Sequence, residues 1–511
     1  MPSISPFKSQ DMLDFGFYLL AFVPLVGYAV WWWFDVRKAV PGVPNLVGYP
    51  IVGNLLDFLP HNILDSLECY KKKYGNLYAM RSFHQRVVVI SEPFLAREVM
   101  MKRPKQFRRT YQSDHTGEVM GISKGLVHAN GALWSRMRRA TAPSFSQKSV
   151  SNMTSDIQQE VTAWIDRLKQ QAEKQYSIDM TQEAFTLTIR VISQAAFGLG
   201  PDNPVSSYFF STVFLQDARD LLVFMLQFTL RRLPIWLWRL SPWYHYERQA
   251  LEATSRFSKH CQAVLDYKRA HPTIGGSAMI DTLLERNTRN VAEGGLTDEE
   301  IQHNMRIFYI AGSETTSVTI NWCCYFLSLH PQVQLRIRDE VATVLSERQQ
   351  QMDMESVKAL AYTYAVVKET MRLRNAVALI SFDLESNIDR VTLSKQLILE
   401  RGDVVWVYAE GVMQSEDIFQ QPADFIPERW LCDHTDATKL SKTEEAFLAF
   451  GSGPRVCPGM HLALLEAVLA IASLVRNFDV CLACDAAEIH RVINLTLAPN
   501  KMPLKLTPIS G

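Results

Sequence analysis

The sequence has no excess of charge of either sign, because 53 lysines and arginines are balanced by 53 aspartates and glutamates. A neutral balance gives no electrostatic reason to expect a nucleic-acid partner. Cysteine is scarce as well, and the eight cysteines are scattered along 511 residues without the spacing of a disulfide framework. Cys481 and Cys484 form a lone pair, but no second pair completes a zinc site. We expect ordinary core thiols in a reducing compartment.

Charged residues are also missing from residues 15–34. Twenty helical residues span about 30 Å, which is the hydrocarbon thickness of a bilayer. A cleaved signal peptide and a buried core helix are the alternatives, but tryptophans at 31–33 end the run and suit a membrane interface. A basic pair follows at 37–38, which favours a cytosolic position for the rest of the chain. The sequence predicts an uncleaved transmembrane anchor at 15–34, after a short lumenal tail at 1–14.

Prolines and glycines are concentrated directly after this anchor. Residues 35–50 include Pro41, Pro44 and Pro50, and proline resists helix formation. We therefore predict a stiff, proline-rich hinge at 35–50 and a single large domain at 51–511.

Within this domain, β-branched and apolar residues cluster at 77–80 and 87–90. Such clusters are typical of strands, and their spacing predicts a strand pair.

A glycine-rich loop from Phe450 to Gly459 contains a cysteine, Cys457, directly before an apolar helical run. Glycines let backbone N–H groups turn towards the sulfur, and the helix places the positive end of its dipole beside it. Arg455 adds a cation two residues away. Together these features favour a thiolate, which is a metal ligand or a nucleophile. A nucleophile would need a base, for which His461 is the nearby candidate.

This loop resembles the haem-binding loop of the cytochrome P450 family, Phe-x-x-Gly-x-Arg-x-Cys-x-Gly, with every fixed position filled. The resemblance implies that Cys457 is the axial ligand of a haem b iron. It also implies that Arg455 binds a haem propionate and that Phe450 belongs to the cofactor site. A thiolate ligand pushes electron density onto the iron and favours O–O cleavage. The fold implied is mainly helical, with a small β-rich lobe near the N-terminus.

Trp134 and Arg138 are four residues apart and therefore share one face of a predicted helix. In most helices such a tryptophan simply packs in the core and the arginine is solvated. In the family resemblance, a helix with Trp-x-x-x-Arg provides both side chains to a haem propionate. Tryptophan offers one N–H donor and arginine a fork that suits carboxylates. We expect this cofactor-binding role for Trp134 and Arg138.

A long helix is predicted from Thr297, which can form a capping box with Glu300, to about His330. Its middle, 311–316, reads Ala-Gly-Ser-Glu-Thr-Thr. A glycine inside a helix costs about 1 kcal/mol relative to alanine. Gly312 therefore indicates a close approach to the backbone at this point.

This stretch resembles the oxygen-activating helix of the same family. The resemblance implies that the flat surface at Gly312 leaves room for dioxygen, that Thr315 hydrogen-bonds it, and that Glu314 relays protons from solvent. Ile307 and Phe308 would line the substrate pocket from the same face. The alternative is an ordinary packed helix with an exposed glutamate.

Glu369 and Arg372 are three residues apart and would pair in any helix. They resemble the family's Glu-x-x-Arg motif, which joins an arginine of a downstream Pro-Glu-Arg segment, here Arg429. The resemblance implies a structural, buried Glu–Arg–Arg network. One departure stands out: the family often has a proline pair and then a basic residue that reaches the haem, whereas 374–382 has no proline and no basic residue after Arg374.

Aromatic and basic residues crowd together at 233–246. Two explanations are equally good: a loop packed into the core, or a patch that dips into the membrane near a substrate entrance.

Four motifs in the family's order make the resemblance specific, and the proline-rich hinge after the anchor resembles that of the family's eukaryotic, microsomal members. The resemblance implies a single-pass enzyme of the endoplasmic reticulum whose catalytic domain faces the cytosol. We expect a haem-thiolate monooxygenase that hydroxylates or epoxidises a lipophilic molecule such as a terpenoid, sterol, fatty acid or other secondary metabolite. No flavin or nicotinamide module is expected after the haem domain. Electrons would then come from a separate NADPH-dependent diflavin reductase, with cytochrome b5 as a further candidate partner.

Two alternatives remain open. The same fold could act without a reductase, as an isomerase, dehydratase or peroxygenase, or it could be a haem sensor without turnover. The pair Glu314 and Thr315 favours the monooxygenase, because the other activities need no relay of protons to dioxygen.

Overall fold

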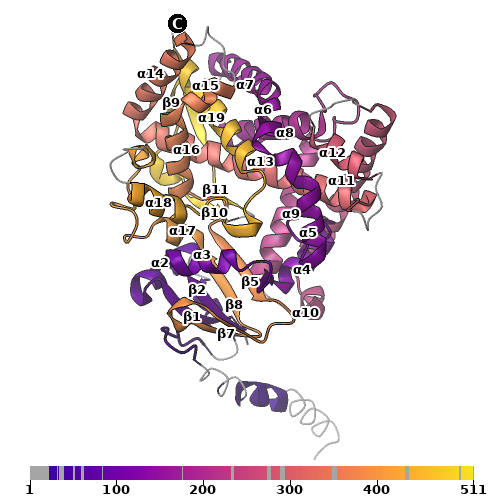
Figure 1. The fold of residues 1–511 in the computed structure, drawn as a ribbon, viewed down its shortest axis with the longest axis vertical. Helices are drawn as coiled ribbons and strands as arrows, with labels where there is room; N and C mark the ends of the chain where they lie inside the picture. Colours follow the sequence, from indigo (N-terminus) through magenta and orange to yellow (C-terminus); the bar gives the residue numbers. More distant parts are fainter. Residues whose placement is uncertain are drawn as a thin grey trace, which may run out of the picture.

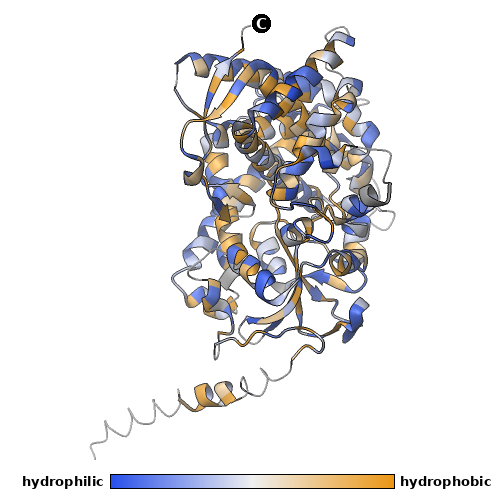
Figure 2. Ribbon diagram, turned by 90° about the vertical axis from the view of Figure 1, so that its left-hand side faces the viewer, coloured by the Kyte–Doolittle hydropathy of each residue, from blue (hydrophilic) through white to orange (hydrophobic). Residues whose placement is uncertain are grey.

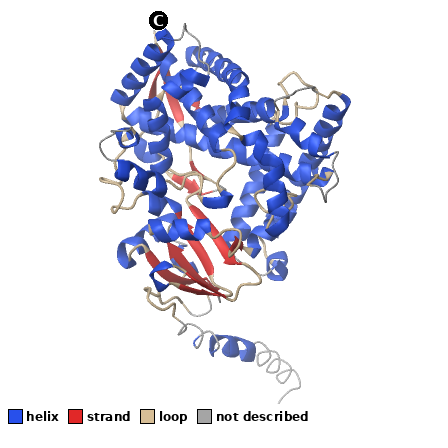
Figure 3. Cartoon of the chain, in the orientation of Figure 1, coloured by secondary structure: helices blue, strands red, loops and turns tan. Residues whose placement is uncertain are grey.

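The protein is described here from a computed structural model that covers residues 22–30, 33, 39–49, 52–58, 63–82, 85–174, 176–231, 235–272, 278–287, 294–347, 354–431, 437–493 and 496–509. Helices make up most of these residues; the larger sheet lies at one end of the molecule, and small sheets lie in its middle and towards the opposite end (Figure 3). The prediction of a mainly helical fold with a small β-rich part is confirmed.

The α-helices follow one another along the whole chain. They are α2 (Ile63–Tyr74), α3 (Pro93–Met101), α4 (Tyr111–Val119), α5 (Gly131–Thr141), α6 (Gln147–Asn152), α7 (Thr154–Lys174), α8 (Met180–Phe197), α9 (Thr212–Arg231), α10 (Ile235–Leu240), α11 (Tyr244–Ala270), α12 (Met279–Asn287), α13 (Asp298–Leu329), α14 (Pro331–Glu347), α15 (Met354–Ala359), α16 (Ala361–Leu373), α17 (Ala409–Met413), α18 (Ala437–Ala446) and α19 (Met460–Asn477). Short 3₁₀ turns lie between them: η1 (Leu55–Phe58), η2 (Ala142–Phe145), η4 (Ser394–Gln396), η5 (Pro427–Trp430), η6 (Gly453–Arg455) and η7 (Ala486–Glu488).

The strands form one larger sheet and three small ones. The strands are β1 (Leu77–Ser82), β2 (Gln85–Ile90), β3 (Phe107–Arg109), β4 (Ile178–Asp179), β5 (Leu379–Leu384), β6 (Arg390–Thr392), β7 (Ile398–Glu400), β8 (Val404–Tyr408), β9 (Phe478–Leu482), β10 (Arg491–Ile493), β11 (Leu497–Pro499) and β12 (Pro503–Pro508). The larger sheet has the order β1-β2-β8-β5-β3, and the small sheets are β10-β11, β4-β12-β9 and β6-β7.

The predicted strand pair at 77–80 and 87–90 is confirmed as β1 and β2, with Leu77 opposite Ile90 and Met80 opposite Val87. The expectation that the sheet is built near the N-terminus is incomplete, because β5 and β8 come from residues 379–408. β8 pairs parallel with β2, and all five of its residues are buried. A continuous buried run of this kind is typical of a strand covered on both faces.

The described part of the predicted hinge is packed on the sheet. The N–H of Leu46 donates to the carbonyl of Ala79, and the N–H of Ala79 donates to the carbonyl of Pro44, each at 2.8 Å. Val40 is also buried. These contacts add the connector to the edge of β1, so the packed body begins before residue 51.

Before the hinge, residues 22–30 are helical, and their apolar side chains are exposed. Figure 2 shows this segment as a hydrophobic helix outside the body of the protein. The remainder of the predicted anchor, 15–21, 31–32 and 34, lies outside the described residues.

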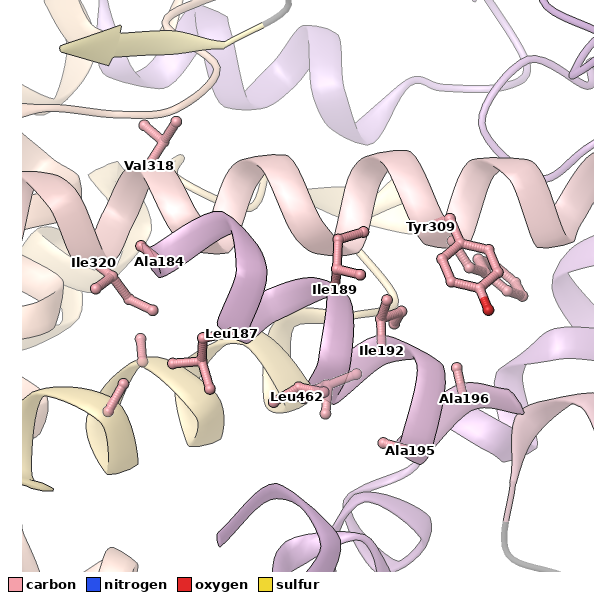
Figure 4. Close-up of a cluster of buried hydrophobic side chains, with 14 of the residues drawn as sticks. Ala184, Leu187, Ile189, Ile192, Ala195, Ala196, Tyr309, Val318, Ile320 and Leu462 are labelled. Atoms are coloured by element: carbon pink, nitrogen blue, oxygen red, sulfur yellow. The ribbon is translucent and has the colours of Figure 1, made fainter. Parts of the chain in front are cut away.

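α13 runs through the centre of the helical part (Figure 1). Its predicted capping box between Thr297 and Glu300 is confirmed, and its last residue is Leu329, with His330 as the C-cap. Nearly every turn of α13 is buried on all sides, as expected of a helix enclosed by other helices. Figure 4 shows α8 alongside it, with Ile189 and Ile192 directed towards α13.

α19 also belongs to the core, although its composition resembles that of a membrane span. By length and hydropathy it could cross a bilayer, but 67% of it is buried inside the protein. Among the described helices it is the single candidate of this kind. This burial identifies α19 as a core helix that follows the cysteine loop.

The prediction that Cys481 and Cys484 are core thiols is wrong. Cys481 is exposed and Cys484 is only half-buried. β9 is an edge strand of its sheet, and alternation along it buries Phe478 and Val480 while Cys481 points outwards. Cys261, Cys323 and Cys324, by contrast, are buried.

Glu369 is the centre of a fully buried ionic network at the end of α16. The Arg372 guanidinium donates to its two oxygens at 2.8 and 2.9 Å, and Arg429 donates to one of them at 2.9 Å. The Trp430 indole and the N–H of Ile426 also donate to Glu369, at 2.9 and 3.0 Å. The predicted Glu–Arg–Arg contact is therefore present, and its carboxylate is fully satisfied.

Arg372 completes the network by reaching the loop before η5. Its remaining donors bind the carbonyls of Met413, Pro422 and Asp424 at 2.7 to 3.1 Å. α16 is thereby tied to the segment that leads towards the cysteine loop.

We predict that Glu369→Ala destabilises the protein by about 3–5 kcal/mol, because it leaves two arginines buried without their counter-charge. Glu445→Ala is the matched control, since its ion pair with Arg97 is half exposed and should contribute less than about 1 kcal/mol. Urea unfolding followed by circular dichroism measures both changes. Equal midpoints for the two variants would contradict a structural role of the network.

Candidate functional site

The cysteine loop is a tight turn closed by its own backbone. The N–H of Cys457 donates to the carbonyl of Phe450 at 3.0 Å, between η6 and the start of α19. Gly451 and Gly453 have φ values of 71° and 72°, which favour glycine. A Cβ on Gly453 would also lie 2.7 Å from the carbonyl oxygen of Met100 in α3. The sequence therefore requires glycine here for both conformation and packing.

Cys457 is accessible although protein surrounds it. The residue is exposed, yet burial raises the pKa of its thiol. A hydrogen bond from the N–H of Gly459 and the charge of Arg138 act in the opposite direction. The cation that acts on the sulfur is therefore Arg138, whereas the sequence pointed to Arg455. His461 is exposed and forms no hydrogen bond with Cys457, so the described residues give the nucleophile hypothesis no base.

Arg455 turns from the sulfur towards α5. Its guanidinium lies 4.6 Å from the centroid of the Trp134 ring and donates to the carbonyl of Ala129 at 2.6 Å. α5 begins at Gly131, so Trp134 and Arg138 lie one turn apart on it. The predicted residues Trp134, Arg138 and Arg455 are thus brought together around the cysteine loop.

Two further residues belong to this cluster and are not predicted from the sequence: a cation, Arg109, and a neutral imidazole, His128. Burial lowers the pKa of Arg109 in β3, and it lowers the pKa of His128 to about 3 with help from the charges of Arg109 and Arg455. The pKa of Arg455 itself is lowered to about 9, by burial and then by repulsion from Arg109. Across the described ranges, no carboxylate forms an ion pair with Arg109, Arg138 or Arg455.

A buried positive cluster of this kind is suited to a ligand with carboxylates. Haem provides an iron for the sulfur of Cys457 and two propionates for the cations. The unpartnered Nδ1 atom of His128 and the indole N–H of Trp134, buried beside Arg455, add polar groups at the same place. The residues present therefore fit a haem held by sulfur at its centre and by cations at its edge.

The oxygen-activation motif lies in the middle of α13. The Thr315 hydroxyl donates to the carbonyl of Ala311 at 2.7 Å. Gly312 faces a different neighbour, because a Cβ there would lie 3.0 Å from Ile192 of α8. The glycine thus permits the close packing of α8 on α13, which is a structural reason beside the predicted cofactor role. Phe308 is buried and packs edge-on against Phe145, with 5.2 Å between the ring centroids.

Glu314 is not the exposed glutamate of an ordinary helix. Burial raises the pKa of its carboxyl group, and a hydrogen bond from the Thr496 hydroxyl, at 2.7 Å, acts against that rise. Thr496 directly precedes β11 and was not predicted, because nothing in its local sequence marks it.

The start of β11 is bound to two other segments of the site. The N–H of Leu497 donates to the carbonyl of Ala376 at 2.9 Å, and its carbonyl accepts from the Trp322 indole of α13 at 2.8 Å. The segment after Arg374 therefore meets α13 through β11, close to Glu314.

Arg374 does not take the place of the missing basic residue. Its guanidinium lies over the Trp322 ring, 5.6 Å from the centroid, and donates to the carbonyl of Leu373 at 2.9 Å. Burial lowers the pKa of Arg374. The predicted departure after Arg374 is thus a real difference in the distribution of charge.

Comparison with known proteins agrees with this geometry. The family profile described as Cytochrome P450 matches residues 41–505. A putative cytochrome P450 of Caenorhabditis elegans, CYP13A4, is 25% identical over 95% of this chain and 97% of its own length. Cytochrome P450 6a2 of Drosophila melanogaster is 25% identical over 92% and 91%. Ferruginol synthase of Salvia fruticosa is 26% identical over 96% and 99%.

We predict that Cys457→Ala abolishes the absorbance of a haem thiolate in the reduced, carbon-monoxide-treated protein, because no other sulfur can take its place in the loop. Cys481→Ala, which removes an exposed thiol, is the control and should keep the spectrum. Absorption spectroscopy of the purified variants measures both. A thiolate spectrum in Cys457→Ala would refute the assigned ligand.

Proposed function

Because the chain belongs to the cytochrome P450 family, with haem as cofactor and monooxygenation as reaction, we propose that it hydroxylates or epoxidises a lipophilic small molecule at a membrane. The observation that carries the proposal is the succession on α13 of Glu314, whose carboxyl group accepts from Thr496, and Thr315, whose hydroxyl donates to the carbonyl of Ala311. Terpenoids, sterols, fatty acids and other secondary metabolites are the substrate classes to test.

The bound haem, with its thiolate ligand, supplies the activation of dioxygen. The chain's own residues deliver protons and hold the proton-delivering groups in place. Burial raises the pKa of the Glu314 carboxyl group, which favours its protonated, proton-donating form more than in an exposed glutamate. Thr315 holds a hydroxyl at the helix surface one residue further, where it can pass a proton on.

An apolar substrate is favoured by the segment that β11 holds near Glu314. Residues 376–380 read Ala-Val-Ala-Leu-Ile, and Ser381 is the first polar residue after them. Val377 is 37% exposed, and Leu379 and Ile380 are half-buried. A partly exposed aliphatic segment whose backbone is hydrogen-bonded to β11, next to Thr496, suits a lipophilic molecule.

Membrane attachment is supported by two apolar surfaces at one end of the molecule. α10 lies towards the same end of the long axis as the helix at 22–30 (Figure 1). Trp236 and Leu240 are 67% and 78% exposed, whereas Trp238 is buried against Phe228. The two predicted explanations for 233–246 therefore apply to different residues: Trp238 is core, and its neighbours suit a membrane interface.

Electrons are proposed to come from an NADPH-dependent diflavin reductase, since the family in general needs a redox partner. Arg139 of α5 and Lys148 of α6 are exposed near the helix turn that carries Arg138. Such cations suit an acidic flavoprotein surface. Cytochrome b5 is the further candidate, and the endoplasmic reticulum is the proposed location.

We predict that the full-length protein, with diflavin reductase and NADPH, converts members of a lipophilic panel into products that carry one added oxygen atom. Thr315→Ala should keep the haem-thiolate spectrum but form roughly tenfold less product per NADPH consumed, because the proton relay is broken. Thr319→Ala is the matched control, since its hydroxyl makes the same contact with the preceding turn, at 3.0 Å.

Product mass and NADPH consumption are measured together. Product that forms without NADPH would favour the reductase-independent alternative. Binding of haem with no turnover of any substrate would favour the sensor. Unchanged coupling in Thr315→Ala would contradict the role of its hydroxyl.

We predict that α10 contacts the bilayer. In full-length protein reconstituted with brominated phospholipids, bromine near the interface should quench Trp236. Trp236→Phe should therefore remove part of the quenched fluorescence. Trp164→Phe, which replaces a fully buried tryptophan of α7, should leave the quenched part unchanged. Equal effects of the two substitutions would place α10 away from the membrane.

A further inference from the structure

Arg103, between α3 and β3, is a buried arginine without a counter-charge. It is 6% exposed, and its Nε atom has no hydrogen-bond partner. Its closest acceptor is the sulfur of Met100 at 3.7 Å, and a thioether is a weak acceptor. Arginine is almost never buried in this way unless it is paired. In the part of the chain that the structure describes, no carboxylate forms an ion pair with Arg103.

The surroundings of Arg103 carry positive charge as well. Its pKa is lowered to about 8, first by burial and then by repulsion from Arg109 and Arg455. Arg455 belongs to the cysteine loop, and its guanidinium lies over the ring of Trp134 in α5. Met100, whose sulfur accepts from Arg103, also packs its carbonyl against Gly453 of the cysteine loop. Arg103 therefore lies beside the cysteine loop and its cations, although it comes more than three hundred residues earlier in the chain. Guanidinium groups that repel one another at low solvation need an anion between them.

Arg103 also lies against the strand that lacks a basic residue. Its guanidinium is 4.3 Å from the centroid of the Phe382 ring in β5. β3 pairs antiparallel with β5, and Arg109 is opposite Phe382. Two arginines of the segment 103–109 therefore flank the position in β5 where the chain carries an aromatic ring. The cation that the stretch after Arg374 does not supply comes from a different part of the sequence.

We propose that Arg103 binds a haem propionate together with Arg455, in place of the basic residue that β5 lacks. Its planar fork suits a carboxylate, and a propionate would supply the missing counter-charge and accept its unpaired N–H groups. Stacking on Phe382 orients the guanidinium but satisfies none of its donors in the ring plane. Because haem is the cofactor of the family for any substrate, this role is independent of the proposed substrate and membrane contacts.

The test is the rate at which the holoenzyme loses haem to an excess of apomyoglobin. Arg103→Leu should release haem about tenfold faster, as expected for the loss of a charge-assisted hydrogen bond. Arg103→Gln, which keeps polarity without charge, should also release it faster. The double variant Arg103→Leu/Phe382→Arg places a cation in β5 and should restore slow release of haem.

Arg167→Leu is the control, because Arg167 of α7 also has a buried nitrogen without a partner, although its side chain is only half-buried, and it lies outside the cluster. Its haem release should match that of the unmodified protein. The reduction potential of the haem gives a second readout: losing a nearby cation in Arg103→Gln should make it more negative. Unchanged release and an unchanged potential in Arg103→Gln would overturn the proposal, even if Arg103→Leu yields no haem-loaded protein.

Discussion

The arrangement of buried positive charge around the cysteine loop is the constraint on which the site depends. Arginines are costly to bury, and among the described residues Arg455 forms no ion pair, although the charge of Glu385 acts on it favourably. The network at Glu369 is the opposite case, because each of its buried charges has a partner. One group of arginines therefore stabilises the fold by itself. The other is complete only when a ligand brings negative charge.

This contrast separates structural from functional charges without reference to sequence similarity. Arg372 and Arg429 direct their guanidinium groups to Glu369 and to backbone carbonyls, so nearly all of their donors are in use. Arg109 and Arg455 each bind one backbone carbonyl through part of the guanidinium and leave other donors open. Arginine is thus structural in one place and able to bind a ligand in the other. The difference is the number of backbone carbonyls within reach of its guanidinium.

Much of the fold and part of the site could be predicted from local patterns. The capping box of Thr297 and the pairing of Glu369 with Arg372 depend on neighbours three residues away, so the sequence displays them directly. The strand pair β1–β2 follows from β-branched runs on either side of a short turn. The cysteine loop was found because its glycines, arginine and sulfur are consecutive.

The remaining features depend on segments that meet only in the folded chain. Arg109 reaches the cluster because β3 pairs with β5, which lies about 270 residues later. Thr496, directly before β11, reaches Glu314 in the middle of α13, 182 residues earlier in the chain. Cys481 is exposed because β9 lies at the edge of its sheet, a position that the sequence around it does not indicate. Periodicity describes an element, but it does not identify the element's neighbours.

The bond between Thr496 and Glu314 has a consequence for how this protein handles molecules of different bulk. The same short segment holds the aliphatic stretch 376–380 through Leu497 and holds the carboxylate through Thr496. A bound substrate that displaces the segment 496–497 from α13 would break the hydrogen bond to Glu314. A substrate that leaves the segment in place would keep the Glu314 side chain fixed. The shape of a substrate would then affect the fraction of electrons that ends in product, independently of its affinity. Two substrates bound equally tightly could therefore consume different amounts of reductant per product formed.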